Sequence, residues 1–255
     1  MLPAQLVEMA LRPWGRPRVG LVLHPTPERI VELDPNFPIP GPNHVGQIRC
    51  APERVAPVVD GTRELARSYG LRCLWILDPD ARPPDLPARL AACGIVPAGD
   101  VAVMVLPATA ELARGSARVE IADALADLGT FAAAEAVQAA AFGSGPAPRQ
   151  EARFGDGRDE PSRHFFLALL DGEPAGAAWA TVRREGVLMN GGAVAPRFQG
   201  RGVYRALLAE RLALARRAGA AGVAAWARPE TSAPILARLG FTEVGRNRLY
   251  RDESA

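Results

Sequence analysis

The stretch Val194–Leu208, which reads VAPRFQGRGVYRALL, decides the fold of this chain. It follows an apolar run and leads into a helical pattern of apolar residues, so we expect a turn from a strand into a helix. The first N–H groups of a helix have no partner within it, and the helix dipole adds about half a positive charge there. Gly200 and Gly202 allow a ligand to approach the main chain. The stretch is therefore predicted to hold an anion such as a phosphate or pyrophosphate.

The spacing within this stretch excludes two common nucleotide-binding motifs. A dinucleotide GxGxxG needs a glycine where Arg205 stands, and a Walker loop needs a lysine, whereas all 30 basic residues of this chain are arginine. Between Arg197 and Arg217, six arginines accompany one acid, Glu210, which leaves a local charge of +5. That charge suits a ligand with several negative charges. For any single arginine, a solvated helix face is the alternative interpretation.

The pattern from Arg197 to Gly202 resembles the pyrophosphate loop of the GNAT acyltransferase superfamily, Q/R-x-x-G-x-G/A. The order of the surrounding elements is similar too, because a short helix and the sequence Leu239-Gly240-Phe241 follow downstream. The resemblance covers about residues 117–255. It implies an α/β (α+β) fold with a mixed central sheet and a V-shaped splay between two parallel strands, and it implies acetyl-CoA as the acyl-donor cosubstrate, without a metal.

In this resemblance the acyl-CoA lies between the strands expected at 188–194 and 223–227. Backbone groups near the end of the first strand would hold the pantetheine and the thioester carbonyl, and the loop amides and two arginines would hold the phosphates. Gly191-Gly192 stands where such proteins place a β-bulge. The residues assigned to the cosubstrate in this way are Ala193, Val194, Gln199, Gly200, Arg201, Gly202, Val203, Tyr204 and Arg205.

The catalytic groups are less well marked. Members of the superfamily often carry a glutamate on the strand that reads VLMNGG here, at 187–192, and a tyrosine where this chain has Leu236. Asn190, acting with water, and Ser232 are therefore the candidates for moving the proton of the amine and assisting the leaving thiol. An N-cap is the plain alternative for Ser232. Tyr250 and Glu230 are weaker candidates.

Hydrophobic periodicity predicts most other elements. Residues 143–163 lack it and are expected to form a loop or lid at the acceptor entrance. On the helix expected at 202–218, Tyr204, Leu208 and Leu212 share an apolar face, and Arg211 is expected off it. Strands are expected at 44–50, 71–77, 101–106, 119–121, 164–170, 175–183, 186–194, 223–227 and 244–251, and further helices at 55–69, 85–93, 125–142 and 233–239.

The two parts of the chain resemble each other. The order of a helix with Leu-Ala-Arg, a strand with tryptophan and a short helix closed by glycine occurs twice. We therefore expect a degenerate GNAT-like N-terminal domain at 1–116 and a catalytic GNAT domain at 117–255. No G-x-G follows the strand expected at 44–50, so the first part is predicted to bind no CoA and to form a wall of the acceptor site.

Composition restricts the class of protein further. With 28 acids the net charge is only +2, which gives no overall attraction to nucleic acid or to an anionic membrane. No apolar run approaches the roughly 20 residues that span a bilayer, and the chain shows no signal-peptide pattern, so a cytoplasmic location is expected. Cys50, Cys73 and Cys93 fit neither a disulfide framework nor a zinc site and are interpreted as small buried hydrophobes.

Three functions are compatible with these features. The first is a CoA-dependent N-acyltransferase, with acetyl as the first candidate group, that acts on a small-molecule or protein amine as a monomer or loose homodimer. The second is a non-catalytic acyl-CoA-binding or sensor protein of the same fold, which the missing glutamate and tyrosine would suit. The third is a nucleic-acid binder that uses the arginines between 197 and 217, which the near-neutral total charge disfavours.

Overall fold

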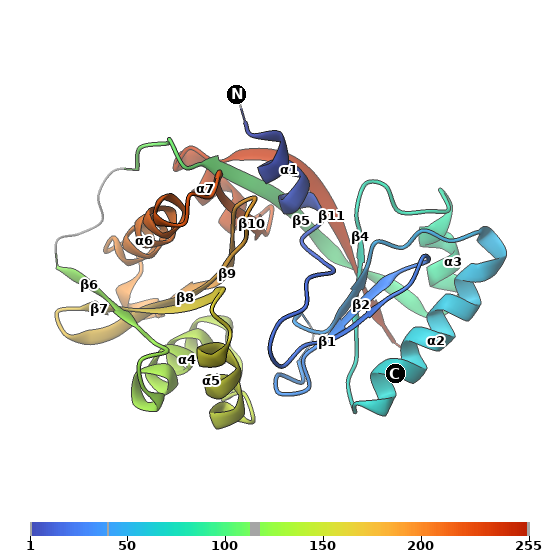
Figure 1. The fold of residues 1–255 in the computed structure, drawn as a ribbon, viewed down its shortest axis with the longest axis horizontal. Coiled ribbons are helices and arrows are strands. Elements are labelled where there is room, and N and C mark those ends of the chain that lie inside the picture. Colours follow the sequence, from blue (N-terminus) through green and yellow to red (C-terminus); the bar gives the residue numbers. More distant parts are fainter. Residues whose placement is uncertain (1, 40, 113–117, 254–255) are drawn as a thin grey trace.

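One open, mixed sheet of eleven strands organises the molecule, with helices on both faces (Figure 1). The computed structural model describes residues 2–39, 41–112 and 118–253, so the domain boundary expected between 116 and 117 lies outside the described residues. The strand order is β1-β2-β3-β4-β11-β5-β10-β9-β8-β7-β6. The mixed sheet of the expected fold class is confirmed.

The strands are β1 (Val22–Pro25), β2 (Ile30–Leu33), β3 (His44–Gly46), β4 (Leu74–Leu77), β5 (Ile95–Pro107), β6 (Val119–Asp123), β7 (Arg163–Leu170), β8 (Glu173–Val182), β9 (Val187–Val194), β10 (Gly222–Ala227) and β11 (Thr242–Asp252). The helices are α1 (Ala4–Leu11), α2 (Val55–Ser68), α3 (Leu86–Ala92), α4 (Leu128–Phe142), α5 (Gln150–Asp159), α6 (Val203–Arg217) and α7 (Ser232–Arg238), with 3-10 turns η1 (Pro52–Arg54) and η2 (Pro196–Phe198).

The chain has a first half, from α1 to β5, and a second half, from β6 to β11. The order of elements in the second half repeats that of the first. In each half, a turn and a helix connect the two strands of a parallel pair, and a short helix and a final strand follow. The elements are β3-η1-α2-β4-α3-β5 in the first half and β9-η2-α6-β10-α7-β11 in the second. The helix ends also match, because Leu71 N–H donates to Ala66 O and Ala220 N–H donates to Ala215 O, at 2.9 Å in each case. An offset of 149 residues therefore aligns α6 with α2 at this end.

The final strands of the halves join them into one sheet. β5 ends the first half in sequence, yet it pairs antiparallel with β10 of the second half. β11 ends the second half and pairs antiparallel with β4 of the first. β5 and β11 also pair with each other at the centre of the sheet. Each half of the sheet thus contains the final strand of the other half, and the chain forms one continuous body (Figure 1).

Helices cover both faces of the second half of the sheet. α6 packs on one face of β8, β9 and β10, and α4 packs on the opposite face of β7, β8 and β9 (Figure 1). Alternating residues of β8 show this, because Ala178 belongs to the core under α6 and Ala177 to the core under α4. α1 lies across β5, β10 and β11 on the same face as α4, since Leu6 shares a core with Leu188 and Ala224. The parallel strands are therefore approached from one face by α6 and from the other by α1 and α4.

Most expected elements are confirmed with shifts at their ends, but the expectation of a loop at 143–163 is wrong. α5 occupies residues 150–159, and tertiary contacts hold it there. Phe154 packs edge-on against Phe131 with ring centroids 5.5 Å apart, and Arg153 is buried and paired with Glu135. The helix has no apolar stripe of its own. A buried ion pair and one aromatic contact anchor it instead. The short elements α1, β1 and β2 in the proline-rich beginning of the chain were also not anticipated.

No helix among residues 2–39, 41–112 and 118–253 has both the length and the hydropathy that a membrane-spanning helix requires.

Candidate functional site

The parallel strands β9 and β10 diverge, which confirms the V-shaped splay. They pair only from Val187 to Met189 and from Val223 to Ala225. Beyond these pairs β9 continues to Val194 and β10 to Ala227 without a ladder between them. The backbone groups that face the gap are thus left for a ligand, as a backbone hydrogen bond that is not made to the neighbouring strand must be made elsewhere.

A β-bulge lies on the β9 wall of the gap. Ala177 of β8 faces Ala193 and Trp179 faces Asn190, so Gly191 and Gly192 together stand opposite one residue of β8. Gly191 has a φ of 55°, which favours glycine at this position. The side-chain amide of Gln138, on α4, donates to the Gly191 carbonyl and holds the bulge from that face. The bulge confirms the expectation from the glycine pair, whereas the part of Gln138 was not foreseen.

The loop between η2 and α6 has the form of an anion site. Gly200 and Gly202 have φ values of 75° and 85°, and a Cβ added at Gly200 would meet no atom within 4 Å. Gly202 is the N-cap of α6 and offers no side chain to bond the first amides of the helix. The open loop and the uncapped helix start fit the pyrophosphate of an acyl-CoA. The side chain of Val203 is in the core, so only its backbone faces the loop as a candidate.

The contacts of the six arginines between 197 and 217 show which of them are already engaged within the chain and which could bind a phosphate. Arg197 pairs with Glu173 at 2.9 Å and Arg217 with Glu210 at 2.8 Å. Arg216 donates to two backbone carbonyls of the segment after β5. Arg201 and Arg205 are exposed on the loop and the first turn of α6, and no carboxylate among the described residues pairs with either. These two arginines remain the candidates for contacts with CoA phosphates.

Arg211 is the fourth of the six arginines that has a partner within the chain, and its position differs from the prediction. It does not lie off the apolar face of α6 but is buried, with 1% of its surface exposed. Its Nε donates to the Leu207 carbonyl at 3.1 Å, and the Tyr204 ring lies beside the guanidinium next to Gly192. Burial lowers the pKa of Arg211 because water no longer solvates the charge. Tyr204 itself is half-buried against the same core.

The catalytic candidates lie on opposite walls of the gap. Asn190 is exposed on β9 and is the neighbour of Trp179 across the ladder, on the face that α4 covers. Ser232 begins α7 just after β10, and its Oγ accepts a hydrogen bond from Arg228 N–H at 2.8 Å. The N-cap position belongs to Thr231 instead, so an N-cap does not explain Ser232. These placements show two polar groups near the gap and leave their roles as predictions.

Two weaker candidates take other positions. Tyr250 is buried in the core of the first half, where it faces Trp75 across the β4–β11 ladder. The exchange of final strands carries it there, so it does not belong to the gap between β9 and β10. Glu230 is exposed in the turn between β10 and α7. Leu236, at the position of the tyrosine found in the superfamily, is 1% exposed and packs in the core.

The N-terminal segment of the chain covers the β10 side of the gap. Trp226 of β10 donates its Nε1–H to the Ala10 carbonyl at 2.9 Å, and Trp14 packs edge-on against it with ring centroids 5.6 Å apart. The contact between these two rings was not predicted, since neither tryptophan shows from local sequence which ring it meets. Among the described residues, no group of three or more His, Cys, Asp or Glu side chains is placed to hold a metal ion.

In the first half, the corresponding strands are held together. β3 and β4 pair at Val45 and Trp75, and the chain then remains bridged because Arg82 N–H donates to Ile48 O at 2.9 Å. Arg49 also reaches the fully buried carboxylate of Asp78 at 2.6 Å. These contacts occupy the place where the second half has its open gap.

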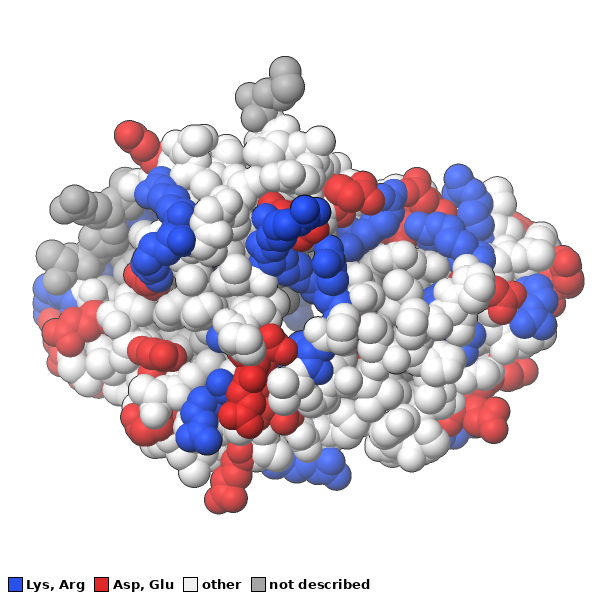
Figure 2. Space-filling model, viewed as in Figure 1, with Lys and Arg blue, Asp and Glu red and all other residues white. Residues whose placement is uncertain are grey.

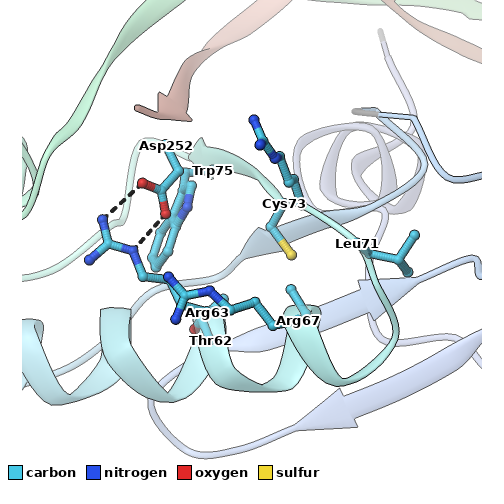
Figure 3. A pocket seen from close by; sticks show the side chains of 9 residues that line it. Thr62, Arg63, Arg67, Leu71, Cys73, Trp75 and Asp252 are labelled. Atoms are coloured by element: carbon cyan, nitrogen blue, oxygen red, sulfur yellow. Dashed lines mark hydrogen bonds and ion pairs between the residues drawn. The ribbon is translucent and has the colours of Figure 1, made fainter. Parts of the chain in front are cut away.

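A shallow pocket of the first half lies elsewhere, between α2, β4 and the end of β11 (Figure 3). Arg63 closes one side through two hydrogen bonds to Asp252, at 2.7 and 2.8 Å. Cys73 points into the pocket, and burial raises its pKa to about 12, so it is a neutral thiol at pH 7. Cys73 is thus buried as expected, whereas Cys50 and Cys93 are only half-buried.

Comparison with known proteins gives the family of part of the chain. Residues 132–241 match the acetyltransferase (GNAT) family, and this part of the chain belongs to the GNAT superfamily. No curated protein matches the sequence.

Solved structures show the same fold over most of the chain. A GCN5-related N-acetyltransferase from Kribbella flavida is 18% identical, with 92% of this chain and 91% of that chain covered and a TM-score of 0.69. One from Sphaerobacter thermophilus is also 18% identical, with coverages of 88% and 80% and a TM-score of 0.60. A tandem GNAT protein from the clavulanic acid biosynthesis pathway is 16% identical, with coverages of 97% and 87% and a TM-score of 0.57.

Proposed function

We propose that this protein is a CoA-dependent N-acyltransferase that transfers an acetyl group from acetyl-CoA to a primary amine of a small molecule or a protein. The observation that carries this proposal is the open gap between β9 and β10 together with the uncapped glycine loop at its end. The gap suits a pantetheine arm, and the glycine loop suits a pyrophosphate. An acyl-CoA has both groups, and the GNAT family match supports it as the ligand.

We also propose a tandem arrangement, with units at 1–116 and 117–255 of which only the second binds acyl-CoA. The closed strands after β3 support this division of roles. The first unit then serves as a wall beside the gap, where Trp14 already packs on Trp226. The sheet is continuous within one chain, which agrees with a monomer or a loose dimer.

The reaction needs a neutral amine, and an alkyl amine with a pKa of about 10.4 is neutral at pH 7 in only about one molecule in 2,500. No carboxylate lies on β9, which reads VLMNGGAV. We therefore propose that the proton leaves through water held by backbone carbonyls and by Asn190. The thiolate leaves with little assistance because a thiol has a pKa near 8.5, and Ser232 is a candidate donor to it. Positioning of both reactants supplies the larger part of the rate.

Calorimetric titration with acetyl-CoA and with CoA tests the proposal. Wild type is expected to bind one equivalent per chain at micromolar concentration, and Gly202→Asp is expected to lose at least about 100-fold in affinity, because it places a carboxylate against the pyrophosphate. Gly70→Asp is the matched control, since Gly70 is an open glycine with a φ of 67° in the first half. No binding by folded wild type would overturn the proposal.

A sensor that binds acyl-CoA without turnover is the second candidate. The absence of a carboxylate on β9 and the buried Leu236 favour it. A panel of primary amines, assayed for release of free thiol from acetyl-CoA, separates the two: turnover of any amine identifies an enzyme, and tight binding without turnover favours the sensor. Nucleic-acid binding is disfavoured, because acids and arginines are mixed over the face shown in Figure 2.

A further inference from the structure

Arg211 is a fully buried charge without a counter-ion. It lies on α6, two turns beyond the glycine loop, with 1% of its surface exposed. Its Nε donates to the neutral Leu207 carbonyl, and the ring of Tyr204 lies beside it. Among the described residues no carboxylate pairs with it, and its Nη2 has no hydrogen-bond partner. Such a group is unusual, because buried charges are normally paired.

The guanidinium lies directly beneath the β-bulge. A Cβ added at Gly192 would be 3.3 Å from Nη2 and 3.4 Å from Nη1 of Arg211. Gly192 immediately precedes Ala193 and Val194 on the β9 wall of the gap. The charge is therefore held against the main chain of this wall, on the side of the sheet that α6 covers.

The first half shows that the fold does not require an arginine here. With the offset of 149 residues, Thr62 of α2 corresponds to Arg211 and Val58 to Leu207. Thr62 is also 1% exposed, and its hydroxyl donates to the Val58 carbonyl at 2.7 Å. A small neutral side chain thus makes the same contact in the half whose strands are closed. The charge occurs in the half with the glycine loop and the open gap.

Burial has two consequences for such a charge. It costs stability, because a guanidinium without an anion loses its hydration and gains little in return. It also preserves the field, because the interaction between charges is far stronger in a water-poor interior than in water and is little screened by salt. A fixed positive charge beneath the gap will therefore act on any group there that gains negative charge.

We propose that Arg211 is a positioning residue for acyl transfer, which polarises the thioester carbonyl of bound acyl-CoA through the Gly192–Val194 wall. As the amine nitrogen bonds to the carbonyl carbon, the π pair of the C=O bond moves to oxygen, and it returns when the C–S bond breaks and the thiolate leaves with its pair. The amine proton passes to water. The positive charge of Arg211 stabilises the oxygen while it is negative. This inference rests on the proposed function, because it requires an acyl-CoA in the gap.

Isotope-edited infrared spectroscopy of acetyl-CoA labelled with carbon-13 at the carbonyl tests this proposal without an acceptor. The C=O stretch is expected to move to lower frequency on binding to wild type. Arg211→Met and Arg211→Gln are expected to lose at least half of that shift, while Arg211→Lys, which keeps the charge, retains more of it than either. Thr62→Val, the matched position of the first half, is expected to give the wild-type band.

Calorimetry and melting temperature separate this role from a structural one. Arg211→Met is expected to bind CoA within about threefold of wild type and to melt at or above the wild-type temperature, because it removes an unpaired buried charge. An unchanged carbonyl band in both neutral variants overturns the proposal, and so does loss of folding or of CoA affinity in both. If wild type binds CoA but shows no carbonyl shift, only this inference fails. If wild type binds no CoA, the proposed function fails with it.

Discussion

The two halves of the molecule differ most where the turn after the first parallel strand meets the helix. In the first half η1 ends at Arg54 and α2 begins at Val55. In the second half Gln199–Gly202 separates η2 from α6. These four residues contain the two glycines of the proposed pyrophosphate loop. A short insertion thus distinguishes the half to which we assign acyl-CoA from the half to which we assign none.

The parallel strand pairs of the two halves also differ, because one pair leaves a gap and the other is bridged. In the second half the ladder between β9 and β10 ends early and leaves a gap. In the first half the Arg49–Asp78 ion pair and the backbone bond from Arg82 to Ile48 hold the corresponding segments together. The same order of elements therefore supports a ligand site or a closed wall, according to the few groups that stand at the end of one strand pair.

The largest effect is expected from a test of whether the halves fold together. Trp75 lies in β4 with 1% of its surface exposed, at the centre of the first core. Trp75→Ala should lower the free energy of unfolding by about 3–5 kcal/mol, as for other large core truncations. Because β5 and β11 cross between the halves, calorimetry should show one transition that moves as a whole. Two transitions, of which only one moves, would show that the halves unfold separately.

An intermediate effect is expected from Cys73, also in the first half. Burial raises the pKa of its thiol from 9.0 to about 12, so between these pH values the unfolded chain loses a proton that the folded chain keeps. The free energy of unfolding must then fall as the pH rises, by about 2 kcal/mol at pH 10.5. Urea unfolding at pH 8 and pH 10.5 measures this loss. Cys73→Ala should lose less unfolding free energy than wild type between these two pH values. An equal loss in wild type and in Cys73→Ala would contradict the raised pKa of Cys73.

The smallest effect is expected in the second half, at the exposed pair of Arg197 and Glu173. Both side chains are more than half exposed, so the pair contributes little to stability. Glu173→Gln frees the guanidinium beside the glycine loop and should raise CoA affinity by about two- to threefold at low salt. The gain should disappear in 0.5 M salt, because exposed charges are screened. A change in melting temperature of several degrees would instead show that the pair supports the fold.

Several features could be read from the sequence because their causes are local. The hairpin between β7 and β8 follows from Asp171-Gly172, both of which take the positive φ values that such a turn needs. α6 follows from the period of its leucines and from the glycine at its N-cap. The bulge follows from two adjacent glycines in a strand, one of which adopts a positive φ.

Other features could not be predicted because their causes lie in distant residues. α5 has no apolar period, and its place depends on Phe131 and Glu135 of the preceding helix. The helical period of the apolar residues predicts Arg211 off the buried face of α6, whereas it packs against the bulge and is buried. Tyr250 was assigned to the half in which it is encoded, but β11 carries it into the other.

The sequence by itself determined the class of fold and the position of the glycine loop, because strand and helix periods, glycine conformations and an uncapped helix start are properties of neighbouring residues. The tertiary structure decided which gap stays open, which strands are exchanged and which arginine is buried. These outcomes depend on pairings between residues far apart in the chain, such as Asp78 with Arg49 and Gly192 with Arg211. Such pairings arise only when the whole sheet is assembled.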